Sequence, residues 1–159
     1  MADTQALDTL LEQATGARDS ALEQHRRALS AADAARRQGE QLSDYRKEYV
    51  RRFGTQPGRA GSVELLQCYH GFMARLDDAV SQQVQLAAQA ARRADDAKTA
   101  LLAAELRVAS VGKLIERRVA EAQARRERAD QKASDEFASR AAWQRMAAVG
   151  ADGLGFGAA

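Results

Sequence analysis

The chain has little of what a compact globular domain or a disulfide-bonded protein needs. Its 159 residues include one cysteine and one proline, and aromatic residues make up only 5% of the sequence. The single Cys68 excludes an internal disulfide, and the single Pro57 leaves long stretches without a helix breaker. Because large core-filling side chains are scarce, the composition favours extended helices over a globule.

Charge of one sign and long apolar runs are also missing. The 24 basic residues oppose 22 acidic ones in a dispersed pattern, which disfavours the concentrated basic stripe of a nucleic-acid-binding protein. No signal peptide is recognisable and no apolar run would cross a bilayer, so we expect a cytoplasmic protein. The histidines, His25 and His70, lie far apart without ligand companions, so we expect no metal and no cofactor.

The chain does contain a heptad repeat, in which an apolar residue recurs at every seventh position within each half. In the first half, this row comprises Leu7, Ala14, Ala21, Ala28, Ala35, Leu42 and Tyr49. We expect its companion row three residues further on, at Leu10, Ala17, Gln24, Ala31, Gln38, Tyr45 and Arg52. A sustained repeat of this kind is typical of a coiled coil and predicts a helix over about 5–53.

The second half carries a longer register of the same kind. Its first row comprises Leu66, Met73, Val80, Ala87, Ala94, Leu101, Val108, Ile115, Ala122 and Ala129. The companion row comprises Tyr69, Leu76, Gln83, Ala90, Ala97, Ala104 and Val111, and then the charged Arg118, Arg125 and Lys132. This register predicts a helix over about 63–146, and the glycine-rich end, 147–159, is expected to be a disordered tail.

The segment between the two registers, 54–62, predicts a turn. It holds three glycines and the only proline, and so short a connection favours antiparallel neighbours. We therefore expect an all-α fold: a long antiparallel two-helix coiled-coil hairpin with a C-terminal helical extension, forming one domain over 1–146. Folding the chain back places Tyr49 opposite Tyr69 and Leu7 opposite Val111, so the second helix should lack an intrachain partner beyond that point.

Aromatic residues gather at two places that could bind other proteins. Near the loop lie Tyr45, Tyr49, Phe53, Tyr69 and Phe72. They either cap the open end of the hairpin or form a docking surface, and we favour docking because two of them fall outside the seam. Further along, Phe137 and Trp143 either contact a partner or pack back on the start of the first helix.

Nothing in the sequence indicates catalysis. It contains no glycine-rich phosphate loop, no nucleophile constellation and no convergent pair of carboxylates, and a two-helix rod offers no concave pocket. We therefore expect a binding protein that is not an enzyme.

Two stretches resemble a known family. The sequences LSDYRKEYVRR (42–52) and DQKASDEFASRAA (130–142) resemble the FliJ proteins of the bacterial flagellar type III export apparatus. The resemblance implies a two-helix rod similar to the coiled coil of the rotary ATP synthase γ subunit. It also implies binding to the hexameric flagellar export ATPase, to the export gate protein FlhA and to export chaperones such as FlgN and FliT. Such a protein would lie on the cytoplasmic face of the inner membrane at the flagellar base, held there by protein partners only.

The resemblance also implies site residues. The gate-facing surface would comprise Gln38, Leu42, Tyr45, Tyr49, Phe72, Leu76, Ala79 and Gln83. The ATPase or chaperone end would comprise Leu7, Leu10, Leu11, Phe137 and Trp143. Two alternatives stay open: a stalk protein of a virulence-type III secretion system, and a coiled-coil nucleic-acid-binding or scaffold protein.

Overall fold

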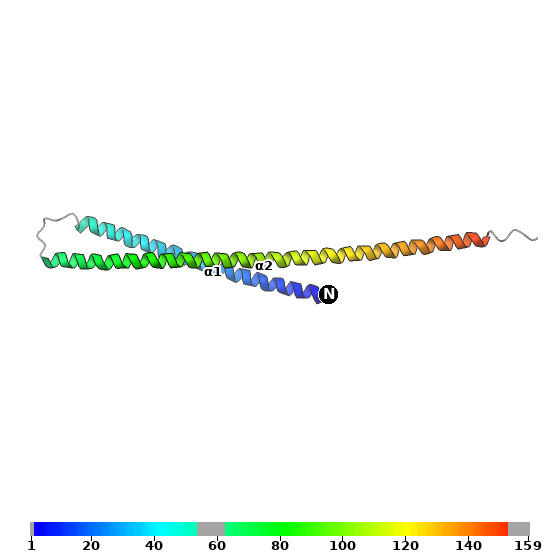
Figure 1. Cartoon of the computed structure of the whole chain (residues 1–159), viewed down its shortest axis with the longest axis horizontal. Helices are drawn as coiled ribbons and strands as arrows, with labels where there is room; N and C mark the ends of the chain where they lie inside the picture. Colours follow the sequence, from blue (N-terminus) through cyan, green and yellow to red (C-terminus); the bar gives the residue numbers. More distant parts are fainter. Residues whose placement is uncertain (1, 54–62, 153–159) are drawn as a thin grey trace, which may run out of the picture.

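The chain forms a hairpin of two long helices. The computed structural model describes residues 2–53 and 63–152, with the side chains of 5–53 and 63–150. All of the described residues are helical, in α1 (Ala2–Phe53) and α2 (Val63–Asp152). Figure 1 shows the two helices running side by side in opposite directions, with α2 continuing far past the start of α1. The predicted all-α hairpin is thereby confirmed, while the predicted loop, 54–62, and the last residues, 153–159, lie outside the described residues.

The helix ends carry charges that suit the helix dipole. Arg51 and Arg52 lie in the last turn of α1, and Glu64 lies in the first turn of α2. With 52 and 90 residues, the helices are about 78 Å and about 135 Å long at 1.5 Å per residue. α2 ends at Asp152 and not near Met146, so the first part of the predicted tail is helical.

The buried side of α2 follows the predicted register. From Tyr69 to Ile115, every position of both predicted rows is buried or half-buried. The most enclosed side chains, among them Ala94 and Leu101, retain 5–8% exposure, and no described side chain falls below 2%. A pair of helices cannot enclose a residue from all sides, so the core is one continuous shallow seam.

The seam on α1 differs from the prediction in one of its two rows. The first row, from Leu7 to Tyr49, is buried or half-buried throughout, as predicted. The expected companion row, from Leu10 to Arg52, is wrong because all of its members are exposed. The second seam row lies four residues after the first and comprises Leu11, Arg18, His25, Ala32, Gly39 and Arg46. Positions three and four residues on flank the first row on opposite sides, and the contacts with α2 select between them.

The two helices cross once along their paired length, as Figure 1 shows. A left-handed two-stranded coiled coil completes a supercoil turn in about 150 Å, so about 78 Å corresponds to roughly half a turn. Half a turn moves α1 from one side of α2 to the other. The single crossing is therefore what a hairpin of this length requires.

The unpaired extension of α2 begins later than predicted. The expectation that it starts beyond Val111 is wrong, because Ile115 and Ala122 are half-buried and line a groove together with Leu7. From Arg125 to Gly150, by contrast, every side chain except that of Ala141 is exposed. Some 45 Å of α2 therefore projects beyond the hairpin at 1.5 Å per residue.

Candidate protein-docking surfaces

The tip of the hairpin carries an aromatic cluster centred on Tyr49. Its ring centroid lies 4.5 Å from that of Phe72, 4.6 Å from Phe53 and 5.9 Å from Tyr69, with the last pair stacked. The predicted meeting of Tyr49 and Tyr69 is thereby confirmed. Tyr45 lies at the margin, 6.2 Å from Tyr49. Contacts at these distances stabilise the tip and hold the outer rings in fixed positions.

Parts of this cluster face solvent. Tyr45 is 50% exposed and Phe53 is 56% exposed, whereas Tyr49 and Phe72 are half-buried. The start of α2 adds three exposed apolar side chains, Val63, Leu65 and Leu66. The prediction that Leu66 begins the buried row of α2 is wrong, because its side chain is 61% exposed. In the sequence, these three residues could have been identified as part of the tip because they directly follow the glycine- and proline-containing segment, 54–62. The tip thus combines internal packing around Tyr49 with an exposed apolar rim, and the docking role of that rim stays a prediction.

An ion pair ties the two helices together beside the cluster. The Arg46 guanidinium donates to the Asp77 carboxylate across the seam. This hydrogen bond, more than the charge attraction, holds the pKa of the Asp77 carboxyl below its ordinary value and raises the pKa of Arg46. Both groups remain accessible to solvent, so the pair contributes more to alignment than to stability.

The predicted gate-facing residues fall into three groups by exposure. Gln38 and Tyr45 are exposed; Leu42, Tyr49, Phe72 and Ala79 are half-buried; Leu76 and Gln83 are buried. All of them lie in the loop-proximal half of the hairpin, but they do not form one continuous accessible face. A partner that docks at this end would meet Tyr45 directly and would meet Leu76 and Gln83 only if the helices separated.

Gln83 is the buried polar side chain of the described residues, at 8% exposure. Its amide nitrogen donates a hydrogen bond of 3.0 Å to the backbone oxygen of Ala35 on α1. Gly39 faces the side chain across the seam: a Cβ at Gly39 would lie 3.6 Å from Cγ of Gln83, an ordinary van der Waals contact. Gln83 therefore joins the helices, and it is not available for a partner in this conformation.

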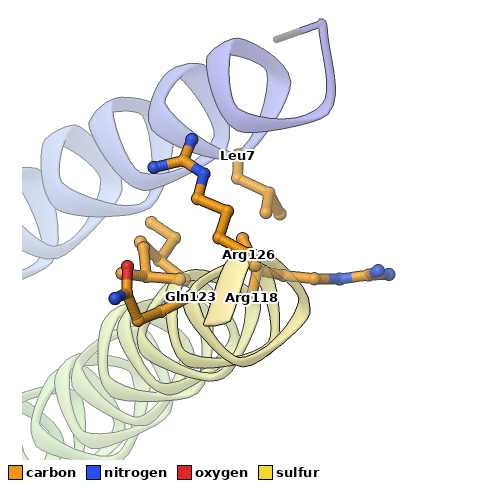
Figure 2. Close-up of a pocket in the computed structure, with 7 residues that line it drawn as sticks. Leu7, Arg118, Gln123 and Arg126 are labelled. Atoms are coloured by element: carbon orange, nitrogen blue, oxygen red, sulfur yellow. The ribbon is translucent and has the colours of Figure 1, made fainter. Parts of the chain in front are cut away.

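At the opposite end, α1 and α2 enclose an open groove of about 200 Å³, which we call the fork groove. Its lining comprises Leu7 from α1 and Ile115, Arg118, Val119, Ala122, Gln123 and Arg126 from α2. Figure 2 shows Leu7 pointing from α1 toward α2, one arginine reaching up toward α1, and the other extending sideways. Of the other leucines predicted for this end, Leu11 is half-buried and Leu10 is 42% exposed.

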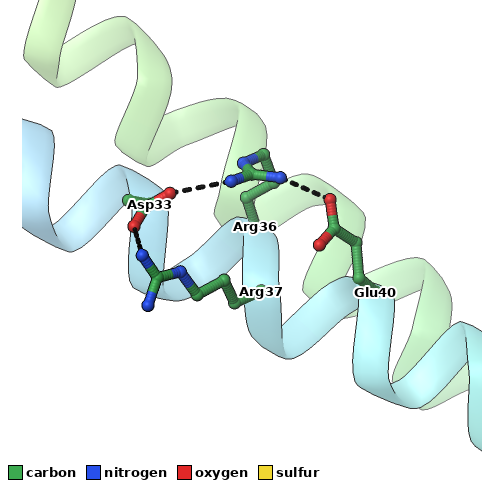
Figure 3. Close-up of polar contacts among 4 residues, drawn as sticks. All are labelled: Asp33, Arg36, Arg37 and Glu40. Carbon is green, nitrogen blue, oxygen red and sulfur yellow. Dashed lines mark hydrogen bonds and ion pairs between the residues drawn. The ribbon is translucent and has the colours of Figure 1, made fainter.

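Some arginines elsewhere on the rod pair with carboxylates on the same helix. Figure 3 shows Arg36 bridging Asp33, at 2.8 Å, and Glu40, at 2.5 Å, while Arg37 approaches the second oxygen of Asp33 at 2.6 Å. The hydrogen bond from Arg36 lowers the pKa of Asp33 from its ordinary value. Such pairs, three and four residues apart, support the helix and leave little net charge for a partner.

The extension of α2 presents its aromatic residues to solvent. Phe137 is 75% exposed and Trp143 is 76% exposed. The alternative in which they pack back on the start of α1 is therefore excluded. Met146 and Val149 are exposed to a similar degree, at 73% and 75%. Large apolar side chains held this far out of any intrachain seam are typical of a contact surface.

The described residues include no group of three or more histidine, cysteine, aspartate and glutamate side chains that could hold a metal ion. Within the same residues, no helix is long and apolar enough to cross a membrane.

A two-helix rod with apolar side chains exposed at both ends is the form of a coiled-coil interaction protein. The sequence model of the flagellar FliJ protein family matches residues 3–147, so the chain belongs to that family. Membership assigns it to flagellar protein export, a type III secretion process, as a stalk component of the export apparatus. No curated protein and no solved structure matches the chain.

Proposed function

We propose that the chain links the export ATPase hexamer to the export gate protein FlhA and also binds export chaperones. The observation that carries the proposal is the separation of two unlike surfaces. An aromatic, partly exposed cluster lies at the tip. A basic groove and an aromatic extension lie at the other end, and α1 between them spans about 78 Å.

The tip is the surface that we assign to the gate. Tyr45 projects from the cluster while Tyr49 beneath it is held by three rings, so the exposed ring is presented in a fixed orientation. Rigid aromatic side chains of this kind supply much of the binding energy in protein interfaces. The gate protein would therefore contact the tip mainly at Tyr45 and Phe53, its exposed aromatic side chains.

The other end is the one that we assign to the ATPase and the chaperones. A helix that inserts into the centre of a ring meets partners on several sides. On the extension, Phe137 and Met146 lie on opposite faces of α2, since nine residues correspond to two and a half turns. This distribution suits a surrounding partner better than a flat one. We propose a stalk role without enzymatic activity. In this role the chain is peripheral on the inner membrane, held there by its protein partners.

Binding to purified gate and ATPase proteins tests the proposal. Tyr45→Ala should weaken gate binding by about tenfold or more, because truncation of an interface hot spot costs ~2 kcal/mol. Leu29→Ala is the matched control, since Leu29 is 49% exposed on the same helix but outside the tip. Helicity and ATPase binding should be unchanged in both variants. Equal gate binding by the two variants would remove the tip from the proposal.

The same binding assays decide between the alternatives. The match to the flagellar family favours the flagellar system over a virulence-type system. A nucleic-acid-binding protein would instead lose DNA affinity steeply as salt rises. Co-purification of the chain with a virulence ATPase and not with the flagellar one would contradict the assignment.

A further inference from the structure

The fork groove carries charge that the chain does not neutralise. Between 117 and 128 there are five arginines and two glutamates. Arg117 pairs with Glu121 at 3.0 Å. Within the part of the chain that the structure describes, Arg118 and Arg126 have no ion-pair partner. Unlike Arg36 and Arg37 in Figure 3, these two arginines therefore keep positive charge available, and they do so beside an apolar groove.

The floor of the groove is apolar and accessible. Leu7 and Ile115 lie on facing helices, and Val119 retains 59% exposure between the two arginines. A site for a small organic molecule usually encloses ~300–1,000 Å³. A volume of about 200 Å³, open to solvent, instead accommodates one or two side chains presented by another protein.

We propose that the fork groove receives an acidic segment of a partner protein, in which apolar side chains enter the groove and neighbouring carboxylates pair with Arg118 and Arg126. Guanidinium groups bind carboxylates through two parallel hydrogen bonds, which fixes orientation as well as charge. The apolar floor favours a protein ligand over a nucleic acid, because a phosphate backbone has no apolar groups to pack against it. That the partner is the export ATPase rests on the proposed function.

A synthetic peptide tests the groove independently of that function. The probe is a capped helical peptide with leucine on one face and glutamate on the other, and its counterpart carries lysine in place of glutamate. Titration into the methyl-labelled full chain should shift the signals of Leu7 and Val119 with the acidic peptide only. The double substitution Arg118→Glu/Arg126→Glu should weaken binding by about tenfold or more, as expected for charged contacts in an interface.

A matched variant separates the groove from general charge. Arg125→Glu/Arg128→Glu makes the same change in net charge on the same stretch of α2, and neither residue lines the groove. This control should alter affinity by less than about threefold at moderate salt, because exposed charges outside the contact are screened. Equal losses in the two double variants would overturn the proposal in favour of a diffuse basic surface. So would a duplex DNA oligonucleotide that displaces the peptide and binds more tightly.

The purified ATPase hexamer then identifies the partner. If it binds the natural chain and the control but not the groove variant, the groove is the ATPase contact. If the peptide results hold and the hexamer does not bind the natural chain, the groove stands and the proposed function fails. If the peptide causes no shifts at Leu7 and Val119, the groove proposal itself is wrong.

Discussion

The substitution Gln83→Leu removes the amide that α2 inserts against the backbone of α1. The seam around it is built largely of alanine, and Ala28 and Ala94, one heptad from Ala35 and Ala87, offer almost the same surface. A slip by one heptad, about 10 Å, would therefore retain much of the small-residue packing. In the native register the Gln83 amide donates to the Ala35 backbone oxygen at 3.0 Å, and Gly39 faces its Cγ. A slip by one heptad would bring Ala32 or Arg46 to the place of Gly39.

The magnitude follows from the hydrogen bond and its alternative. A neutral hydrogen bond contributes ~1 kcal/mol net, and burying the amide without a partner costs a further ~1–3 kcal/mol. A slip that leaves the Gln83 amide without an acceptor is thus less favourable than the native register by about 2 kcal/mol or more, which is a factor of ~30 in population. Leucine removes this gap, although it leaves the overall free energy of unfolding within about 1 kcal/mol because it adds apolar burial. We therefore expect the register, and not the melting temperature, to change.

Distances between two spin labels measure the register. With Cys68→Ser as background, cysteines at the exposed positions Gln24 and Ser81 place one label on each helix. The natural seam should give one narrow distance distribution, and Gln83→Leu should add a second population displaced by up to about 10 Å. Gln85→Leu, at an exposed position, is the control and should keep the single population. A single unchanged distribution for Gln83→Leu would refute the register argument.

Four further predictions follow from the same structure. Phe72→Ala should lower the melting temperature as well as gate binding, because its ring lies 4.5 Å from Tyr49; an unchanged melting temperature in thermal circular dichroism would show that the contact is unimportant. Gly39→Ala should raise the free energy of unfolding by up to ~1 kcal/mol, since the added Cβ meets Gln83 at an ordinary 3.6 Å and alanine favours helix; destabilisation in urea would show that the seam has no room there. The lowered pKa of Asp77 means that its pairing stabilises the fold above the ordinary carboxyl pKa and is lost as the pH falls through the folded-state value. Asp77→Asn should accordingly reduce the melting temperature relative to Asp78→Asn at about pH 7, and the two should converge at about pH 2. Finally, Trp143, at 76% exposure, should shift its fluorescence to shorter wavelength when the ATPase or a chaperone binds; an unchanged spectrum on saturation would place the contact elsewhere.

Most of the fold can be predicted from local sequence. The glycines and proline of 54–62 separate two uninterrupted helical patterns, and helix propensity fixes where those patterns run. The larger seam residues of α2, such as Met73, Leu76 and Leu101, specify its buried side because their burial outweighs that of the small or charged residues around them. The aromatic tip was also visible in sequence, since rings concentrated on either side of one short loop must meet when the chain folds back.

Three features depended on the tertiary structure. The first row of α1 is flanked on both sides by alanines and polar residues, so sequence alone did not distinguish the row of Leu10 from the row of Leu11. Contacts across the seam select the row of Leu11, to which Arg46 belongs, and Arg46 pairs with Asp77 on α2. Likewise, the burial of Gln83 depends on an acceptor 48 residues away, which no local pattern reveals. The fork groove forms because the first turns of α1, at Leu7, lie against α2 between Ile115 and Arg126. Local sequence specifies which segments are helical and which residues of α2 face inward, because these properties depend on neighbours three, four and seven residues away. The register and the exposed surfaces depend on which residues of the other helix lie opposite, so they follow only from the packed pair of helices.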